Sequence, residues 1–120
     1  MAVCGGALRS YLLEQDALPR KSLVSQVPVS FRAKDDTAGG NSIGMVLASL
    51  GTDESDTLAR FDKVKSSMSA GKDLLRNMDA LQITAYSALM TLPFSVGQMT
   101  GFGNRKSRPM SNVVISNVPG

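Results

Sequence analysis

The sequence predicts an α/β fold in which a layer of helices covers a mixed sheet. Three observations support this prediction. Residues 23–31 alternate between apolar and polar side chains, as a half-buried strand does, and residues 57–75 repeat apolar side chains at helical spacing. A β-branched run close to the last residue predicts a further strand. The predicted order is helix, two strands, helices and strand, which is typical of helices packed on one sheet.

Residues 1 to about 15 form the first predicted helix. Gly5 and Gly6 lie within it and each costs about 1 kcal/mol of helix propensity relative to alanine. We therefore expect this helix to approach a neighbouring element closely. Pro19 lies in the loop that follows. The apolar positions with helical spacing are Val3, Cys4, Ala7, Leu8, Tyr11 and Leu12.

Two strands should follow as antiparallel neighbours across a polar connection. In residues 23–31, Leu23, Val27, Val29 and Phe31 share one face, and Gln26 and Ser30 share the other. Pro28 interrupts this run, so we expect an edge strand or a bulge there. Residues 43–50 are almost continuously apolar, which predicts a strand covered on both faces.

Two helices are predicted next. The small and acidic residues 51–56 suit a helix entry, with Ser55 or Asp56 as the cap. The helix that follows is expected to bend or break at Gly71. The second helix should begin at Asp79 and end near Leu92, before Pro93, with residues 94–110 mostly in a loop. The apolar residues that define the first of these helices are Leu58, Phe61, Val64, Met68, Leu74 and Leu75.

The last nine residues read NVVISNVPG and begin at Asn112. Val113, Val114 and Ile115 favour a strand packed on at least one face. Pro119 and Gly120 are expected to end its pairing. A domain seldom ends so soon after a packed strand, so we expect the sequence to be part of a longer protein.

Composition excludes several classes of function. A hydrophobic content of 42% with 19% charged residues indicates a globular protein. The net charge is only +3 and aromatic residues make up 5%, which argues against a nucleic-acid-binding surface. The single cysteine, Cys4, excludes an intrachain disulfide and a cysteine-cluster metal site. No run approaches the ~20 apolar residues of a membrane span, and no signal peptide is evident. The absence of histidine excludes Ser–His and Cys–His catalytic pairs and histidine-ligated zinc.

Five segments in the right order resemble the C-terminal domain of the bacterial wax ester synthase / acyl-CoA:diacylglycerol acyltransferase family. The segments are AVCGGALRSYL (2–12), VPVSFR (27–32), GGNSIG (39–44), TDE (52–54) and NVVISNVPG (112–120). The family's catalytic HHxxxDG motif is absent, because the chain has no histidine. Residues 1–120 are therefore predicted to form a partial C-terminal domain that lacks the N-terminal HHxxxDG domain.

The resemblance implies the fold of CoA-dependent acyltransferases related to chloramphenicol acetyltransferase, with the active site between two linked α/β domains. A histidine of the first domain then acts as general base on the acceptor hydroxyl, and the alkoxide attacks the acyl-CoA thioester. The implied products are free CoA and either triacylglycerol or a wax ester. Acyl-CoA is a co-substrate and no cofactor is implied. The chain alone is expected to be inactive and to require the N-terminal domain of the same enzyme. The implied location is the cytoplasm, including the surface of the inner membrane or of lipid inclusions.

The candidate site residues follow from the same resemblance, and none is catalytic or metal-binding. The substrate-channel or motif candidates are Pro28, Gly40, Asn41, Asn112, Ser116, Asn117, Pro119 and Gly120. Ser116 and Asn117 would face an acyl carbonyl or pantetheine amide, or else Asn117 sets the turn before Pro119. The glycines at 39 and 40 lack the spacing of a phosphate loop, so a plain turn is favoured there.

Two further groups have a binding interpretation and a simpler structural one. Arg105, Lys106 and Arg108 would contact a CoA phosphate or an anionic membrane, or are solvated loop charges. An acyl-chain groove, or otherwise ordinary core, would be formed by Met90, Phe94, Met99, Phe102 and Met110.

Two alternatives to the enzyme remain open at this point. One is a non-catalytic module that binds a lipid or a protein partner. The other is an inactive gene fragment. An upstream reading frame encoding HHxxxDG would favour the enzyme.

Overall fold

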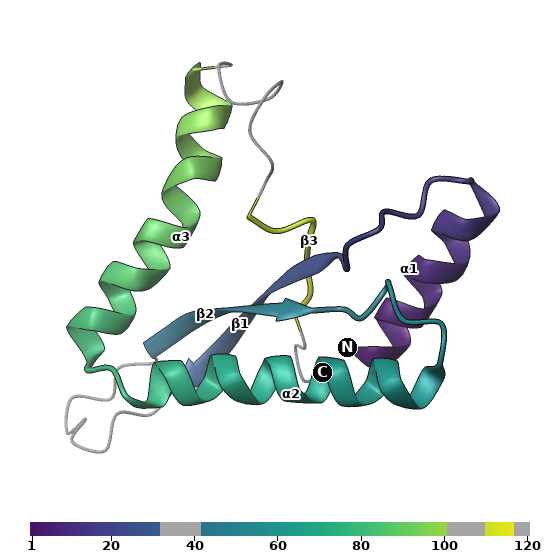
Figure 1. Cartoon of the computed structure of the whole chain (residues 1–120). Helices are drawn as coiled ribbons and strands as arrows, with labels where there is room; N and C mark the ends of the chain where they lie inside the picture. The colour runs from purple at the N-terminus through teal and green to yellow at the C-terminus, as the bar shows by residue number, and fades with distance from the viewer. Residues whose placement is uncertain (32–41, 101–109, 117–120) are drawn as a thin grey trace.

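The computed structural model describes residues 1–31, 42–100 and 110–116 (Figure 1). Three helices and three strands follow one another in the predicted order. The helices are α1 (Ala2–Glu14), α2 (Thr57–Arg76) and α3 (Ala80–Thr100), and the strands are β1 (Val24–Phe31), β2 (Ser42–Ser49) and β3 (Val113–Val114).

The sheet is mixed, as predicted, with strand order β2-β1-β3. β1 and β2 pair antiparallel in an unbroken register from Val24 opposite Ser49 to Phe31 opposite Ser42. β3 pairs parallel with β1, and Val113 lies opposite Ser25. The expected antiparallel neighbours are therefore confirmed.

Pro28 lies in the middle strand of the sheet, and the expected edge strand or bulge is wrong. Its register with Met45 is continuous with that of its neighbours. The N–H groups of Asn112 and Ile115 donate to the carbonyls of Val24 and Gln26, so alternate residues of β1 direct their backbone groups towards β3. The backbone nitrogen of Pro28 faces the same side, beyond the short β3. The proline therefore removes no bond from the β1–β2 ladder.

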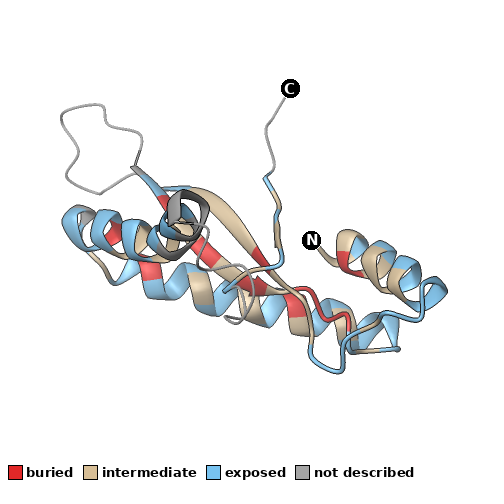
Figure 2. Ribbon diagram, turned by 90° about the horizontal axis from the view of Figure 1, so that it is seen from above, coloured by how far each residue is buried: buried red, intermediate tan, exposed pale blue. Residues whose placement is uncertain are grey.

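The helices cover one face of the sheet, so the expected cover on both faces of β2 is wrong for the described residues. Val46, Ala48 and Leu50 are buried, whereas Ile43 on the opposite face is 56% exposed. Figure 2 shows the buried residues concentrated where β2 lies over α2. The core cluster consists of Val46, Leu75 and Ile83, with Val29, Met68, Met78 and Tyr86 packed against it.

α2 continues through Gly71, so the predicted break there is also wrong. A Cβ atom at this position would lie 2.3 Å from Cγ1 of Val46. The glycine therefore allows the helix to approach β2 closely instead of interrupting the helix. The cap prediction is confirmed for Asp56, whose Oδ2 accepts a 2.7 Å hydrogen bond from the N–H of Ala59.

Substituting Gly71→Ala should destabilise the protein by about 1 kcal/mol. Overpacking against the stiff, buried Val46 costs about 1–3 kcal/mol, and the better helix propensity of alanine returns up to about 1 kcal/mol. Urea unfolding followed by circular dichroism measures the change. The exposed neighbour Lys72→Ala is the control and should unfold at the wild-type midpoint. A Gly71→Ala protein more stable than wild type would contradict the close contact.

α3 continues past Pro93 to Thr100, so the prediction that it ends there is wrong, and residues 94–100 are helical instead of loop. Its start is fixed by a reciprocal pair of hydrogen bonds, from the N–H of Asp79 to Oε1 of Gln82 and from the N–H of Gln82 to Oδ1 of Asp79. The hydroxyl of Thr91 donates to the carbonyl of Ser87 just before the proline. Such a bond from a threonine hydroxyl to the carbonyl one turn earlier occurs within helices and often bends them. No helix among the described residues is long and apolar enough to cross a membrane.

At the outer edge of β2, two backbone N–H groups donate hydrogen bonds to helix side chains. The N–H of Met45 donates to Oγ of Ser87 on α3, and the N–H of Ser49 donates to Oγ of Ser67 on α2. An uncovered edge promotes pairing with other chains. The two serines therefore reduce the capacity of this edge to extend the sheet.

Candidate functional site

Asn112 forms two hydrogen bonds that join the beginning of β3 to β1. Its N–H donates to the carbonyl of Val24 at 2.8 Å, and its Oδ1 accepts from the N–H of Val24 at 2.9 Å. The side chain thus takes the place of a backbone acceptor in the ladder. This channel or motif candidate has a structural role in the described part of the chain.

Ser116 and Pro28 lie towards the same end of the β1–β3 pair. Ser116 is exposed and follows Ile115, whose N–H donates to the carbonyl of Gln26 at 3.0 Å. Pro28 follows two residues after Gln26 and is half-buried. Asn112 lies at the opposite end of this short pairing. Pro28 and Ser116 therefore each follow the paired segment of their own strand by two residues, on the same side of this parallel pairing.

The remaining sequence candidates lie outside the described residues. They are Gly40, Asn41, Asn117, Pro119 and Gly120 of the predicted channel, and Arg105, Lys106 and Arg108 of the predicted anion contact. Of the predicted acyl-chain groove, Met90 is half-buried in α3 and Met110 is 47% exposed. Nothing is described for Phe102 or for the side chains of Phe94 and Met99.

Gln26 was not among the sequence candidates, but it is chemically conspicuous in the structure. Its Nε2 is buried and has no hydrogen-bond partner. It belongs to the set of β1 residues that face away from the helices, as the sequence pattern placed it. A buried amide without a partner is uncommon. The alternation of the sequence predicts on which face of β1 Gln26 lies. It cannot predict that Nε2 lacks a hydrogen-bond partner, because this depends on residues that are distant in sequence.

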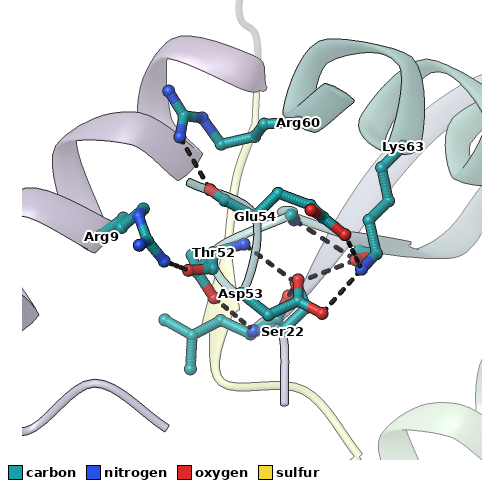
Figure 3. Close-up of polar contacts among 10 residues, drawn as sticks. Arg9, Ser22, Thr52, Asp53, Glu54, Arg60 and Lys63 are labelled. Carbon is teal, nitrogen blue, oxygen red and sulfur yellow. Dashed lines mark hydrogen bonds and ion pairs between the residues drawn. The ribbon is translucent and has the colours of Figure 1, made fainter. Parts of the chain in front are cut away.

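A polar junction joins α1, the two residues before β1 and the loop after β2 (Figure 3). We call it the Thr52 junction and define it by Arg9, Ser22, Leu23 and Thr52. The fully buried Thr52 accepts from the N–H of Leu23 through Oγ1 at 2.9 Å, and its own N–H donates to Oγ of Ser22 at 3.2 Å. The guanidinium of Arg9 donates to the carbonyl of Thr52. These bonds hold three distant segments together.

A group of charged side chains borders this junction (Figure 3). Nζ of Lys63 lies 2.6 Å from Oδ2 of Asp53 and 3.2 Å from Oε1 of Glu54. The hydrogen bond from Lys63 lowers the pKa of Asp53 below its ordinary 3.8, and the bonds to both carboxylates raise the pKa of Lys63 above 10.5. The contribution of Asp53 to stability is therefore lost only as the pH falls below about 4, and that of Lys63 only above about 10.5. Near neutral pH Lys63 is protonated and cannot accept a proton, and the lowered pKa of Asp53 makes its carboxylate a weak base, so neither group is suited to deprotonate an alcohol.

The described residues show no catalytic constellation of their own. No three histidine, cysteine or acidic residues among them lie together as metal ligands would. Cys4 is half-buried in α1, and the whole sequence contains no histidine. The hydrogen bonds and ion pairs described above stabilise the sheet and its connections. They do not place a recognisable general base among the described residues.

Substituting Asn112→Ala should cost about 1 kcal/mol of stability, because the N–H of Val24 loses its acceptor. Hydrogen exchange should show faster exchange at the Val24 amide. Asn112→Asp keeps an oxygen at this position and is the matched control, for which slow exchange should persist. Equal exchange at Val24 in the alanine variant and the wild type would contradict the structural role.

The comparisons with known proteins agree on one family. The model of the WS/DGAT C-terminal domain matches residues 39–120. A probable diacylglycerol O-acyltransferase of Mycobacterium tuberculosis is 44% identical over 121 residues, which cover 100% of this chain and 26% of that protein. The O-acyltransferase WSD of Acinetobacter baylyi is 40% identical over 120 residues, with 100% and 26% covered.

The fold also matches a solved structure. The wax ester synthase/diacylglycerol acyltransferase from Marinobacter aquaeolei superposes with a TM-score of 0.77 at 39% identity, over 99% of this chain and 25% of that one. The chain thus spans about a quarter of the length of these relatives. The resemblance inferred from five sequence segments is confirmed, and the chain belongs to the WS/DGAT C-terminal domain family of acyl-CoA O-acyltransferases.

Proposed function

We propose that the chain is the C-terminal part of an enzyme that transfers a fatty acyl group from acyl-CoA to diacylglycerol or to a long-chain alcohol. The observation that carries this proposal is the superposition of 99% of the chain on a wax ester synthase/diacylglycerol acyltransferase. The Mycobacterium and Acinetobacter relatives, which are named as O-acyltransferases, support the same class of reaction.

In this proposal the reaction requires a base that the described residues do not supply. An alcohol near neutral pH is a poor nucleophile until its proton is removed. The alcohol oxygen then forms a bond to the thioester carbonyl carbon, the C–S bond breaks, and CoA leaves as a thiol. The chain has no histidine, and its Lys63–Asp53 pair remains charged at neutral pH. In our proposal the base is the histidine of the HHxxxDG motif in the N-terminal domain.

The C-terminal part would supply the sheet of the second domain and a wall of the substrate channel. Ser116 and Pro28, which lie towards one end of the β1–β3 pair, would belong to this wall together with Gly40, Asn41, Asn117, Pro119 and Gly120. Arg105, Lys106 and Arg108 would contact a CoA phosphate or an anionic lipid surface. The proposed location is the cytoplasm, at the inner membrane or lipid inclusions.

A chimera tests this proposal. The matching quarter of the Marinobacter enzyme is replaced by this chain, and transfer from palmitoyl-CoA to hexadecanol or dioleoylglycerol is measured. We expect ester formation by the chimera, and none by the Marinobacter enzyme truncated by that quarter or by the isolated chain. A well-folded chimera no more active than the truncated enzyme would contradict the proposed function. Turnover by the isolated chain would contradict the assignment of the base to the other domain.

A further inference from the structure

The two long helices differ sharply in charge. In the 20 residues of α2 there are seven charged side chains: Arg60, Asp62, Lys63, Lys65, Lys72, Asp73 and Arg76. The 21 residues of α3 contain none. A helix with a charged outer face is typical of one that borders water, whereas a helix that is apolar on all sides is usually enclosed. α3 contains glutamine, serine and threonine but no charged residue, so it lacks the charged outer face that is typical of a helix bordering water.

Among the described residues, neighbours pack against only one side of α3. Ile83 is buried in the core, and Ser87 accepts a hydrogen bond from Met45 of β2. On the other side, Leu81, Leu89 and Leu92 are 79%, 63% and 58% exposed. Their spacing of eight and three residues places them along one stripe of the helix. Figure 1 shows that α3 leans away from the sheet towards its C-terminal end. The exposed fractions of the three leucines indicate that the described residues leave most of this stripe uncovered.

We propose that this stripe of Leu81, Leu89 and Leu92 is a protein interface, covered by the part of the acyltransferase fold that the chain does not span. The inference rests on the proposed function. The relatives are about four times as long as the matched segment, so most of each relative lies outside this segment and is available to cover the stripe. Burial of exposed leucines favours association, and the cores of protein interfaces are poor in charged residues.

A lipid surface fits α3 less well. Helices that lie on a membrane combine an apolar face with a polar face rich in lysine and arginine. α3 has no charged residue on any face, and its second face is already occupied by the core of the sheet. The stripe therefore has the chemistry of a protein-covered surface.

Cysteine labelling of the chimera tests the interface. Leu89→Cys on the stripe and Lys65→Cys on the exposed side of α2 are made separately in the Cys4→Ser chain. Each variant is treated with a maleimide as the isolated chain and within the chimera, and peptide mass spectrometry gives the labelling rate at the new cysteine. We expect at least tenfold slower labelling of Leu89→Cys in the chimera than in the isolated chain. Lys65→Cys should react at the same rate in both.

Other outcomes identify other occupants and overturn the proposal. Rapid labelling of Leu89→Cys in a folded chimera shows an open stripe. Slow labelling already in the isolated chain, together with a dimeric mass by light scattering, shows a second copy as the occupant. Protection that appears only with phosphatidylcholine/phosphatidylglycerol vesicles shows a lipid surface. Labelling needs no turnover, so an inactive chimera with a protected Leu89→Cys refutes the proposed function alone, and an active chimera with an open stripe refutes this interface alone.

Discussion

Substituting Gly5→Ala is expected to destabilise the protein by about 3 kcal/mol, the largest single effect we predict. A Cβ atom at Gly5 would lie 2.2 Å from the main-chain oxygen of Leu50. This carbonyl cannot move aside easily, because Leu50 is fully buried and its N–H donates to the carbonyl of Leu23 at 2.9 Å. Relief of the clash therefore requires α1 to move from its site, and overpacking of this kind costs 1–3 kcal/mol or more.

The neighbouring glycine provides a matched control. A Cβ atom at Gly6 would meet only the guanidinium of Arg60, at 3.5 Å or more, which is ordinary van der Waals contact. Gly6→Ala should therefore raise stability by up to about 1 kcal/mol through helix propensity. Urea unfolding of the two variants measures the difference. Equal midpoints for Gly5→Ala and Gly6→Ala would show that α1 does not contact the Leu50 carbonyl as described.

The order of elements was predictable because it depends on local pattern. The alternation of apolar and polar residues predicts β1, and the helical spacing of apolar residues predicts α1 and α2. The β-branched run predicts β3. The expectation that a glycine pair permits a close approach of α1 is confirmed at Gly5. The register of β1 and β2 also follows the faces that the sequence assigned to Gln26 and Val27.

The errors arose where distant contacts override local preference. A glycine within a helical pattern suggests a break, but Gly71 is explained by Val46, which lies 25 residues earlier in the chain. The helix α3 continues past Pro93 although proline usually ends a helix. The apolar run of β2 predicted cover on two faces, yet the described chain covers one. A local apolar run shows that a strand is buried but does not specify which neighbours cover each face.

The site was predictable as a family motif and much less as geometry. The order of five segments identified the family, whereas the bonds of Asn112 to Val24 span 88 residues and have no local signal. The sequence predicts for Thr52 only a position in the segment that precedes a helix. Its partners Arg9 and Ser22 lie 43 and 30 residues away in sequence, so no spacing rule could assemble the Thr52 junction.

Substituting Thr52→Val should destabilise the protein by about 2 kcal/mol. Valine has nearly the shape of threonine, so the packing of this fully buried side chain is preserved. What is lost is Oγ1, the acceptor for the N–H of Leu23 at 2.9 Å. The valine methyl group also keeps water from this N–H, and leaving a buried donor without a partner costs about 1–3 kcal/mol.

Thr52→Ser separates the hydrogen bond from the packing, because serine keeps the hydroxyl and loses the methyl group. We expect the serine variant to retain slow hydrogen exchange at the Leu23 amide, whereas the valine variant should lose it together with its stability in urea. The Arg9 and Ser22 bonds involve the main chain of Thr52 and remain available in both variants. A valine variant as stable as wild type would therefore mean that these backbone bonds suffice to join α1 and β1 to the loop after β2. A destabilised valine variant beside a stable serine variant would identify the Thr52 hydroxyl as the contact on which the beginning of β1 depends.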